Sequence, residues 1–78
     1  DTDWKILGKV AASSQRPDYN GSFLDHVKKE SHARLNLSED AQIEEAIAEM
    51  FRAWAIDRSS ITGKPASIFR RIVKFIAG

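Results

Sequence analysis

Two glutamates spaced one helical turn apart, Glu45 and Glu49, are the side chains of this sequence best suited to carry chemistry. Residues four apart in an α-helix project from the same side, so both carboxylates should leave one side of a helix. Such a pair can supply one metal ligand and one carboxylate that orients a neighbouring ligand, in a site completed by another helix. The same spacing occurs on solvated helices, where Glu49 would pair with Arg52. The spacing alone leaves both interpretations open.

The two histidines do not extend this pair into a known metal-binding motif. His26 and His32 are six residues apart, which places them about 120° from each other on one helix and keeps them from gripping one metal ion. The segment that contains them does not match H-E-x-x-H. We therefore expect two surface or half-buried histidines. The alternative is that one of them folds over and completes a zinc site with Glu45.

Motifs of other enzyme classes are missing from the sequence. None of its serines occurs in a G-x-S-x-G nucleophile turn, and there is no glycine-rich loop of the kind that cradles phosphate. No cysteine is present, which excludes disulfide bonds and thiolate metal sites and leaves the redox compartment undetermined. We do not expect this chain alone to be a catalyst, and we expect no cofactor.

The glutamate pair lies in the clearest helical pattern of the chain. Apolar residues recur at helical spacing within residues 42–56, while the glutamates fall on an adjoining flank. Ser38 is suited to cap the N-terminus of this helix, and Glu39 and Asp40 suit the positive end of its dipole. The pattern ends near Arg58. The sequence thus predicts a helix with one core face and one acidic flank.

Two helices are predicted before this one. Asp3 is suited to cap a first helix, in which Gly8 costs about 1 kcal/mol relative to alanine. Residues 13–21 have the Ser, Pro, Asp, Asn and Gly content of a connecting loop. Ser22 is then suited to cap a second helix that ends near Asn36.

A fourth helix is predicted at the end of the chain, with Pro65 in its first turn. Its broad apolar face lies opposite a cationic side. A helix of this kind either buries its apolar face in a bundle or lies in a membrane interface. Its cations are not interleaved with aromatic residues that stack on bases, so we do not expect nucleic acid as a partner. The residues of this membrane or partner face are Phe69, Arg70, Arg71, Ile72, Val73, Lys74, Phe75 and Ile76.

The charges are separated along the chain, although the net charge is only +1. Residues 39–57 carry six acidic residues and one arginine, whereas residues 58–78 carry five basic residues and no acidic one. The two segments complement each other or are solvated, or else the basic segment binds a membrane or nucleic acid.

The chain of 78 residues is at most one domain, and a domain of this size buries only about 60 to 65% of its unfolded surface. Because it begins at Asp1 and its only methionine is Met50, we expect part of a longer protein or a processed product. A protein partner or the remainder of that protein would support its marginal core. No signal-peptide pattern or apolar run near the ~20 residues that span a bilayer is present, so we expect a soluble or at most peripheral unit.

Residues 44–54, together with the Gly/Pro loop and residues 67–75 that follow them, resemble the closing segment of zincin-like metallopeptidase domains. Such domains occur in large polyvalent proteins of bacteriophages and conjugative elements. There, a helix with the pattern E-x-x-x-[DE] follows H-E-x-x-H and donates the third zinc ligand. The resemblance covers residues 39–77 and implies Glu45 as a zinc ligand and Glu49 as the residue that orients a zinc-bound histidine. Because H-E-x-x-H is absent from this sequence, it implies zinc only in a larger parent protein.

These patterns predict an all-α fold, a small antiparallel bundle of three to four helices joined by short loops, within residues 1–78. The expected role is a non-catalytic interaction or assembly module of a larger phage- or mobile-element-encoded protein, which the resemblance would place in the bacterial cytoplasm or a virion. The alternatives are a zinc metallopeptidase fragment that supplies the third metal ligand, and a peripheral membrane-binding module. The residues expected in the core are Trp4, Leu7, Phe23, Leu24, Val27, Leu35, Ile43, Ile47, Met50, Phe51, Trp54, Phe69, Ile72, Val73 and Ile76.

Overall fold

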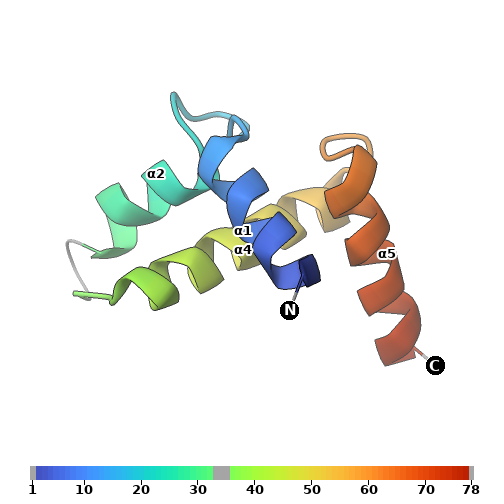
Figure 1. Cartoon of the computed structure of the whole chain (residues 1–78). Helices are drawn as coiled ribbons and strands as arrows, with labels where there is room; N and C mark the ends of the chain where they lie inside the picture. The colour runs from blue at the N-terminus through green and yellow to red at the C-terminus, as the bar shows by residue number, and fades with distance from the viewer. Residues whose placement is uncertain (1, 33–35, 78) are drawn as a thin grey trace.

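The computed structural model describes residues 2–32 and 36–77, and the regular elements within these ranges are all helices (Figure 1). The predicted all-α fold, a small helical bundle, is confirmed. In chain order the helices are α1 (Thr2–Ser13), α2 (Phe23–Val27), the π-helix η1 (Lys28–His32), α4 (Glu39–Ile56) and α5 (Gly63–Ala77).

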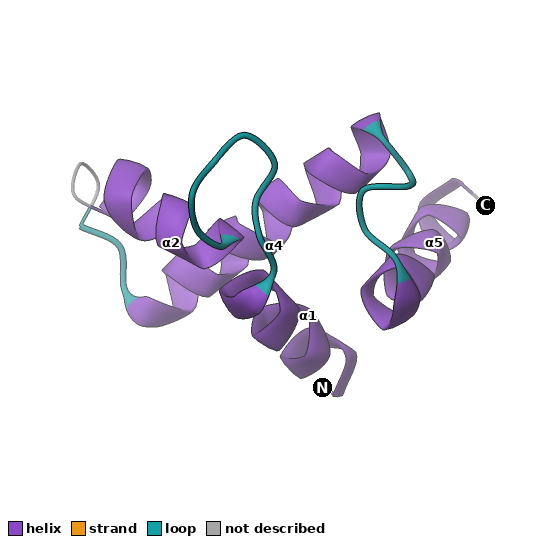
Figure 2. Cartoon of the chain, turned by 90° about the horizontal axis from the view of Figure 1, so that it is seen from above, coloured by secondary structure: helices purple, strands orange, loops and turns teal. Residues whose placement is uncertain are grey.

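The helices α1, α2 and η1 pack on the long helix α4, and α5 packs against α1. α1 crosses α4, and α2 with η1 runs back along α4 in the opposite direction (Figure 1). α5 follows a short turn at the end of α4 and is steeply inclined to it. Its C-terminal end extends past the other helices in both views (Figure 1 and Figure 2). Only the first part of α5 is therefore enclosed by the bundle.

The predicted serine caps fix where α2 and α4 begin. The Ser22 hydroxyl accepts a hydrogen bond from the backbone N–H of Asp25 (3.0 Å), and the Asp25 carboxylate accepts one from the backbone N–H of Ser22 (3.0 Å). The backbone N–H of Ser22, followed by its hydroxyl, lowers the pKa of the Asp25 carboxyl. At the start of α4, Ser38 accepts a hydrogen bond from the backbone N–H of Ala41 (3.2 Å).

One predicted helix boundary is wrong, and another falls beside residues outside the described ranges. The first helix begins at Thr2, so Asp3 lies inside its first turn and is not the cap. The second helix changes from α to π geometry at Lys28, and its described part ends at His32. Asn36, near which this helix was predicted to end, lies outside any helix and has a left-handed φ of 50°. A helix interior does not tolerate this conformation.

One hydrophobic core draws on α1, α2, α4, α5 and the turn before α5. The aromatic rings of Phe51, Trp54 and Phe69 meet where α4 and α5 join, with ring centroids 5.1 to 5.7 Å apart. The guanidinium group of Arg58 covers the indole, 4.0 Å from the ring centroid. The buried apolar residues of this core are Leu7, Ala11, Phe23, Val27, Ala46, Ile47, Met50, Trp54, Ile61, Ala66, Ile68 and Phe69.

Most of the predicted core residues lie in this core or against it. Those confirmed as buried are Leu7, Phe23, Val27, Ile47, Met50, Trp54 and Phe69. Those that are half-buried and packed against the core are Leu24, Ile43, Phe51 and Val73.

Three predicted core residues are wrong, because Trp4, Ile72 and Ile76 are 45%, 38% and 76% exposed. Trp4 lines an open groove between α1 and α4, so solvent reaches one side of its ring. Ile72 and Ile76 belong to the C-terminal half of α5, and the C-terminal end of this helix extends past the other helices (Figure 1). Leu35 lies outside the described residues.

Candidate functional site

Glu49 joins three parts of the chain through one carboxylate. Its Oε1 accepts a hydrogen bond from Arg16 Nε (3.0 Å), while His26 Nδ1 lies 3.0 Å from Oε1 and 3.1 Å from Oε2. The side chains of Glu49, His26 and Arg16 are 12%, 21% and 30% exposed. Partial removal from water strengthens charge-assisted hydrogen bonds of this kind. The cluster therefore ties α2 and the loop before it to the middle of α4.

The loop of residues 14–22 carries Arg16 to α4. Its ends are held together by an antiparallel bridge between Gln15 and Ser22 and by a hydrogen bond from the backbone N–H of Arg16 to the Gly21 carbonyl (2.8 Å). Gly21 has φ +153°, a conformation that glycine adopts without strain. The loop is thus closed on itself and presents its arginine in a fixed direction.

The helix α2 places His26 between Glu49 and an aromatic ring. Tyr19 meets the imidazole edge-on, with ring centroids 5.0 Å apart, and Lys29 Nζ lies 6.0 Å from the centroid of the Tyr19 ring. The imidazole is therefore half-buried, as expected from the sequence. The side chain of His32 is outside what the structure describes.

Sequence reasoning did not find the partners of Glu49. Arg16 and His26 precede it by 33 and 23 residues, so no local spacing connects them. One sequence feature could have indicated that Glu49 has a cationic partner. Glu49 directly precedes Met50 at the edge of the apolar stripe, and a carboxylate that is partly buried there needs such a partner. The alternative that Glu49 pairs with Arg52 is wrong, because the carboxylate is engaged by α2 and the loop.

The structure gives the two glutamates different surroundings. Glu45 and Glu49 lie on one side of α4, but α2 and the loop of residues 14–22 cover only Glu49, and Glu45 is exposed. No three His, Cys, Asp or Glu residues within residues 2–32 and 36–77 form a group that could hold a metal ion. Zinc requires such a group of ligands. The site that the resemblance implies takes its histidines from a larger parent protein and only Glu45 and Glu49 from this chain.

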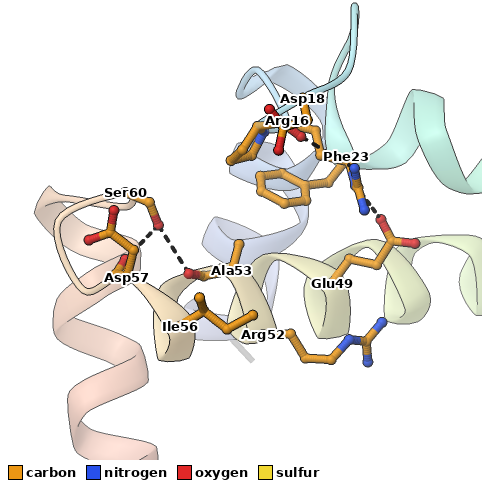
Figure 3. Close-up of a pocket in the computed structure, with 10 residues that line it drawn as sticks. Arg16, Asp18, Phe23, Glu49, Arg52, Ala53, Ile56, Asp57 and Ser60 are labelled. Atoms are coloured by element: carbon orange, nitrogen blue, oxygen red, sulfur yellow. Dashed lines mark hydrogen bonds and ion pairs between the residues drawn. The ribbon is translucent and has the colours of Figure 1, made fainter.

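An open hollow of about 460 Å³ lies beside this cluster, between the loop of residues 14–22 and the C-terminal part of α4 (Figure 3). Phe23 and Ala53 contribute apolar surface to it. At its rim the hydroxyl of Ser59, followed by its backbone N–H, lowers the pKa of the Asp57 carboxyl. The residues that line the hollow are Arg16, Pro17, Asp18, Phe23, Glu49, Arg52, Ala53, Ile56, Asp57 and Ser60.

The hydroxyls near this hollow are not arranged as nucleophiles. Ser60 Oγ donates to the carbonyl oxygens of Asp57 (2.7 Å) and Ala53 (3.2 Å), and Ser59 Oγ donates to the Asp57 carboxylate (2.6 Å). A nucleophilic serine donates its hydroxyl proton to an adjacent general base. Here the hydroxyl of Ser60 donates to backbone carbonyl oxygens. No histidine is among the lining residues. Among the charged lining residues, Arg16 and Glu49 are paired with each other and Asp57 accepts hydrogen bonds from Ser59.

The apolar stripe of α5 has two halves with different surroundings. In the first half, Ile68 and Phe69 are 3% and 1% exposed within the core. Further along the same helix, Ile72, Phe75 and Ile76 are 38%, 88% and 76% exposed. Residues three and four apart share a helix face, so these three continue the buried stripe into solvent. We name Ile72, Phe75 and Ile76 the outer α5 face.

Cations accompany the outer α5 face. Arg70, Arg71 and Lys74 are exposed, and α5 contains no acidic residue. Arg71 Nη2 lies 3.3 Å from Asp3 Oδ2 at the start of α1, a solvent-exposed pair that stabilises the fold little. Phe69, which the sequence assigned to this membrane or partner face, is buried. The accessible part of the face therefore begins at Arg70.

No protein-family model, curated protein or solved structure matches this chain. Its function is therefore inferred from the geometry of the described residues. Within residues 2–32 and 36–77, none of the helices is both long enough and apolar enough to cross a bilayer.

Proposed function

We propose that this chain is a non-catalytic interaction module of a larger protein, and that it docks through the outer α5 face. The observation that carries the proposal is the continuation of the core stripe of Ile68 and Phe69 into Phe75 and Ile76, which no described element covers. A helix end that only met solvent would carry polar residues on this side as well. Grouped apolar side chains bordered by polar ones are typical of an interaction surface.

Phe75 and Ile76 of the outer α5 face contribute little to the stability of the fold. Burial of an isoleucine or phenylalanine side chain contributes about 1.5 to 3 kcal/mol relative to its exposure. Phe75 and Ile76 gain little of this in the chain by itself, since they are 88% and 76% exposed. A partner that covered them would gain it without unpacking Trp54 or Phe69. Docking and folding are therefore separate events in this module.

Substitutions in the two halves of α5 test the proposal. Phe75→Ser should change the free energy of unfolding by no more than about 0.5 kcal/mol. Phe69→Ser, the same exchange in the buried half, should cost at least about 3 kcal/mol. Denaturant titration followed by circular dichroism measures both. A loss for Phe75→Ser as large as that for Phe69→Ser would show that the outer α5 face is part of the core, and the proposal would fail.

A zinc metallopeptidase fragment is the second candidate function, and one contact favours it. Glu49 holds Nδ1 of His26, and a carboxylate paired with imidazole in this way is how metal-bound histidines are oriented. Arg16 shares the same carboxylate, however, and Glu45 has no imidazole beside it among the described donor groups. This candidate requires histidines from elsewhere in a larger protein of the phage or mobile-element kind that residues 39–77 resemble.

Calorimetry with zinc tests whether this chain forms a metal site by itself. We expect the 78-residue chain to bind zinc more weakly than about micromolar, because carboxylates without imidazole or thiolate partners hold zinc poorly. Glu45→Gln should leave the titration unchanged. A sub-micromolar site that Glu45→Gln abolishes would overturn the non-catalytic proposal.

A further inference from the structure

We infer that the outer α5 face binds the surface of an anionic lipid membrane, an inference that rests on the docking role proposed for this face. The face is a short apolar stripe on a helix whose charged residues are Lys64, Arg70, Arg71 and Lys74. Helices that lie in a bilayer interface have this combination. Their apolar side chains enter the boundary of the acyl chains, and their basic side chains meet the headgroups.

The charged residues near the outer α5 face determine whether it binds a positively or a negatively charged surface. All five charged residues of the segment 58–78 are basic. Arg70 and Lys74 are exposed on the same turns as the outer α5 face. Two copies of the chain that met symmetrically through this face would bring these cations toward each other, which opposes association. An anionic surface beside the outer α5 face attracts both Arg70 and Lys74.

The size of the face favours a membrane over a protein partner. Its three side chains expose a few hundred Å², whereas a stable protein–protein interface covers about 800 Å² on each partner. A bilayer interface has no such threshold, since it accepts single apolar side chains and adds attraction from each nearby cation. Phe75 and Ile76, which are 88% and 76% exposed, supply the apolar part.

The position of α5 allows contact without unfolding. Ile68 and Phe69 hold its first half in the core. Its C-terminal end extends past the other helices on its side of the molecule in both views (Figure 1 and Figure 2). The last turns of α5 are therefore accessible to a flat surface without displacement of the bundle.

Vesicle binding tests the inference. The 78-residue chain is sedimented with vesicles of phosphatidylcholine alone and with vesicles that also contain phosphatidylserine. We expect binding only to the second kind, weakened by added salt. The double variant Phe75→Ser, Ile76→Ser should bind at least about tenfold more weakly, and so should Arg70→Gln, Lys74→Gln. Ile56→Ser is the matched control, because it removes an isoleucine of α4 that is also 88% exposed, and it should bind as the wild type does.

Three outcomes would overturn the inference: no binding to either vesicle, equal binding to both, or equal binding by the wild type and the Phe75→Ser, Ile76→Ser variant. Sedimentation velocity without lipid adds a fourth, a dimer that this variant loses, since the face would then be an interface between copies. These failures are distinct from failure of the docking role. If Phe75→Ser leaves the fold intact but vesicles are not bound, the surface remains a docking surface and its partner is a protein or the remainder of a larger chain.

Discussion

Nδ1 of His26 lies within hydrogen-bond distance of both carboxylate oxygens of Glu49, at 3.0 and 3.1 Å. The contact spans two helices that are distant in sequence, and Arg16 adds a third element through the same carboxylate. The side chain of Glu49 is only 12% exposed. If its carboxylate were removed, water could not easily take over its hydrogen bonds to Arg16 and His26. The loss of this one charge should therefore affect three parts of the fold at once.

Neutralising Glu49 should destabilise the chain far more than neutralising Glu45. Glu49→Gln leaves Arg16 and His26 without the anion they share, and the loss of hydrogen bonds to a charged group costs about 1.5 to 3 kcal/mol. Glu45→Gln makes the same exchange on the same helix at an exposed position and should cost less than about 0.5 kcal/mol. Denaturant titration of both variants checks this. Equal losses would mean that the cluster does not stabilise the fold.

The two tryptophans should respond oppositely to truncation. Trp54→Ala removes a fully buried ring that packs on Phe51 and Phe69, and a loss of about 3 to 5 kcal/mol is expected. Trp4→Ala removes a ring that is 45% exposed and should cost less than about 1 kcal/mol. Chemical denaturation of the two variants provides the comparison. A reversed order would show that the groove beside Trp4 is the better packed of the two sites.

Stability should fall in acid through the cap of α2. The capping box lowers the pKa of Asp25 in the folded chain, so its stabilisation is complete above the unfolded pKa of about 3.9. It is lost as the pH falls through the lower folded pKa, where the carboxylate takes up a proton. The thermal midpoint of the wild type should therefore decrease more than that of Asp25→Asn over this range. Parallel decreases in the two proteins would argue against the capping box as the source.

Gly63 should resist substitution for reasons of backbone conformation alone. Its φ is +72°, and nothing lies within 4 Å of the position that a Cβ would occupy. Gly63→Ala should therefore cost about 1 to 2 kcal/mol through left-handed strain and not through a clash. Gly63→Asn should cost less, because asparagine adopts this conformation more readily. Thermal unfolding followed by circular dichroism distinguishes the two. An Ala variant as stable as the wild type would show that the turn can rearrange.

The sequence predicted the fold through patterns among residues close together in the chain. It did not predict contacts between residues far apart in the chain. Ser22 and Ser38 identify helix starts because a cap depends on residues three positions away, and the spacing around Trp54 identifies a buried face for the same reason. The sequence did not reveal that Arg16 meets Glu49, because that contact depends on how a loop closes over α4. Periodicity placed Ile76 on the correct side of α5. It cannot tell where the neighbouring helices stop, so the residue was wrongly expected in the core.

The two halves of α5 should also differ in how often they open. Around Ile68 and Phe69, breaking a backbone hydrogen bond requires the core to loosen, so amide hydrogens there should exchange with solvent slowly. Around Phe75 and Ile76, opening exposes almost no additional apolar surface, so exchange should be fast. A partner bound to the outer α5 face would slow exchange in the last turns and so reduce the difference between the two halves. The slowing of exchange in the last turns is thus a direct measure of occupancy that requires no knowledge of what has bound.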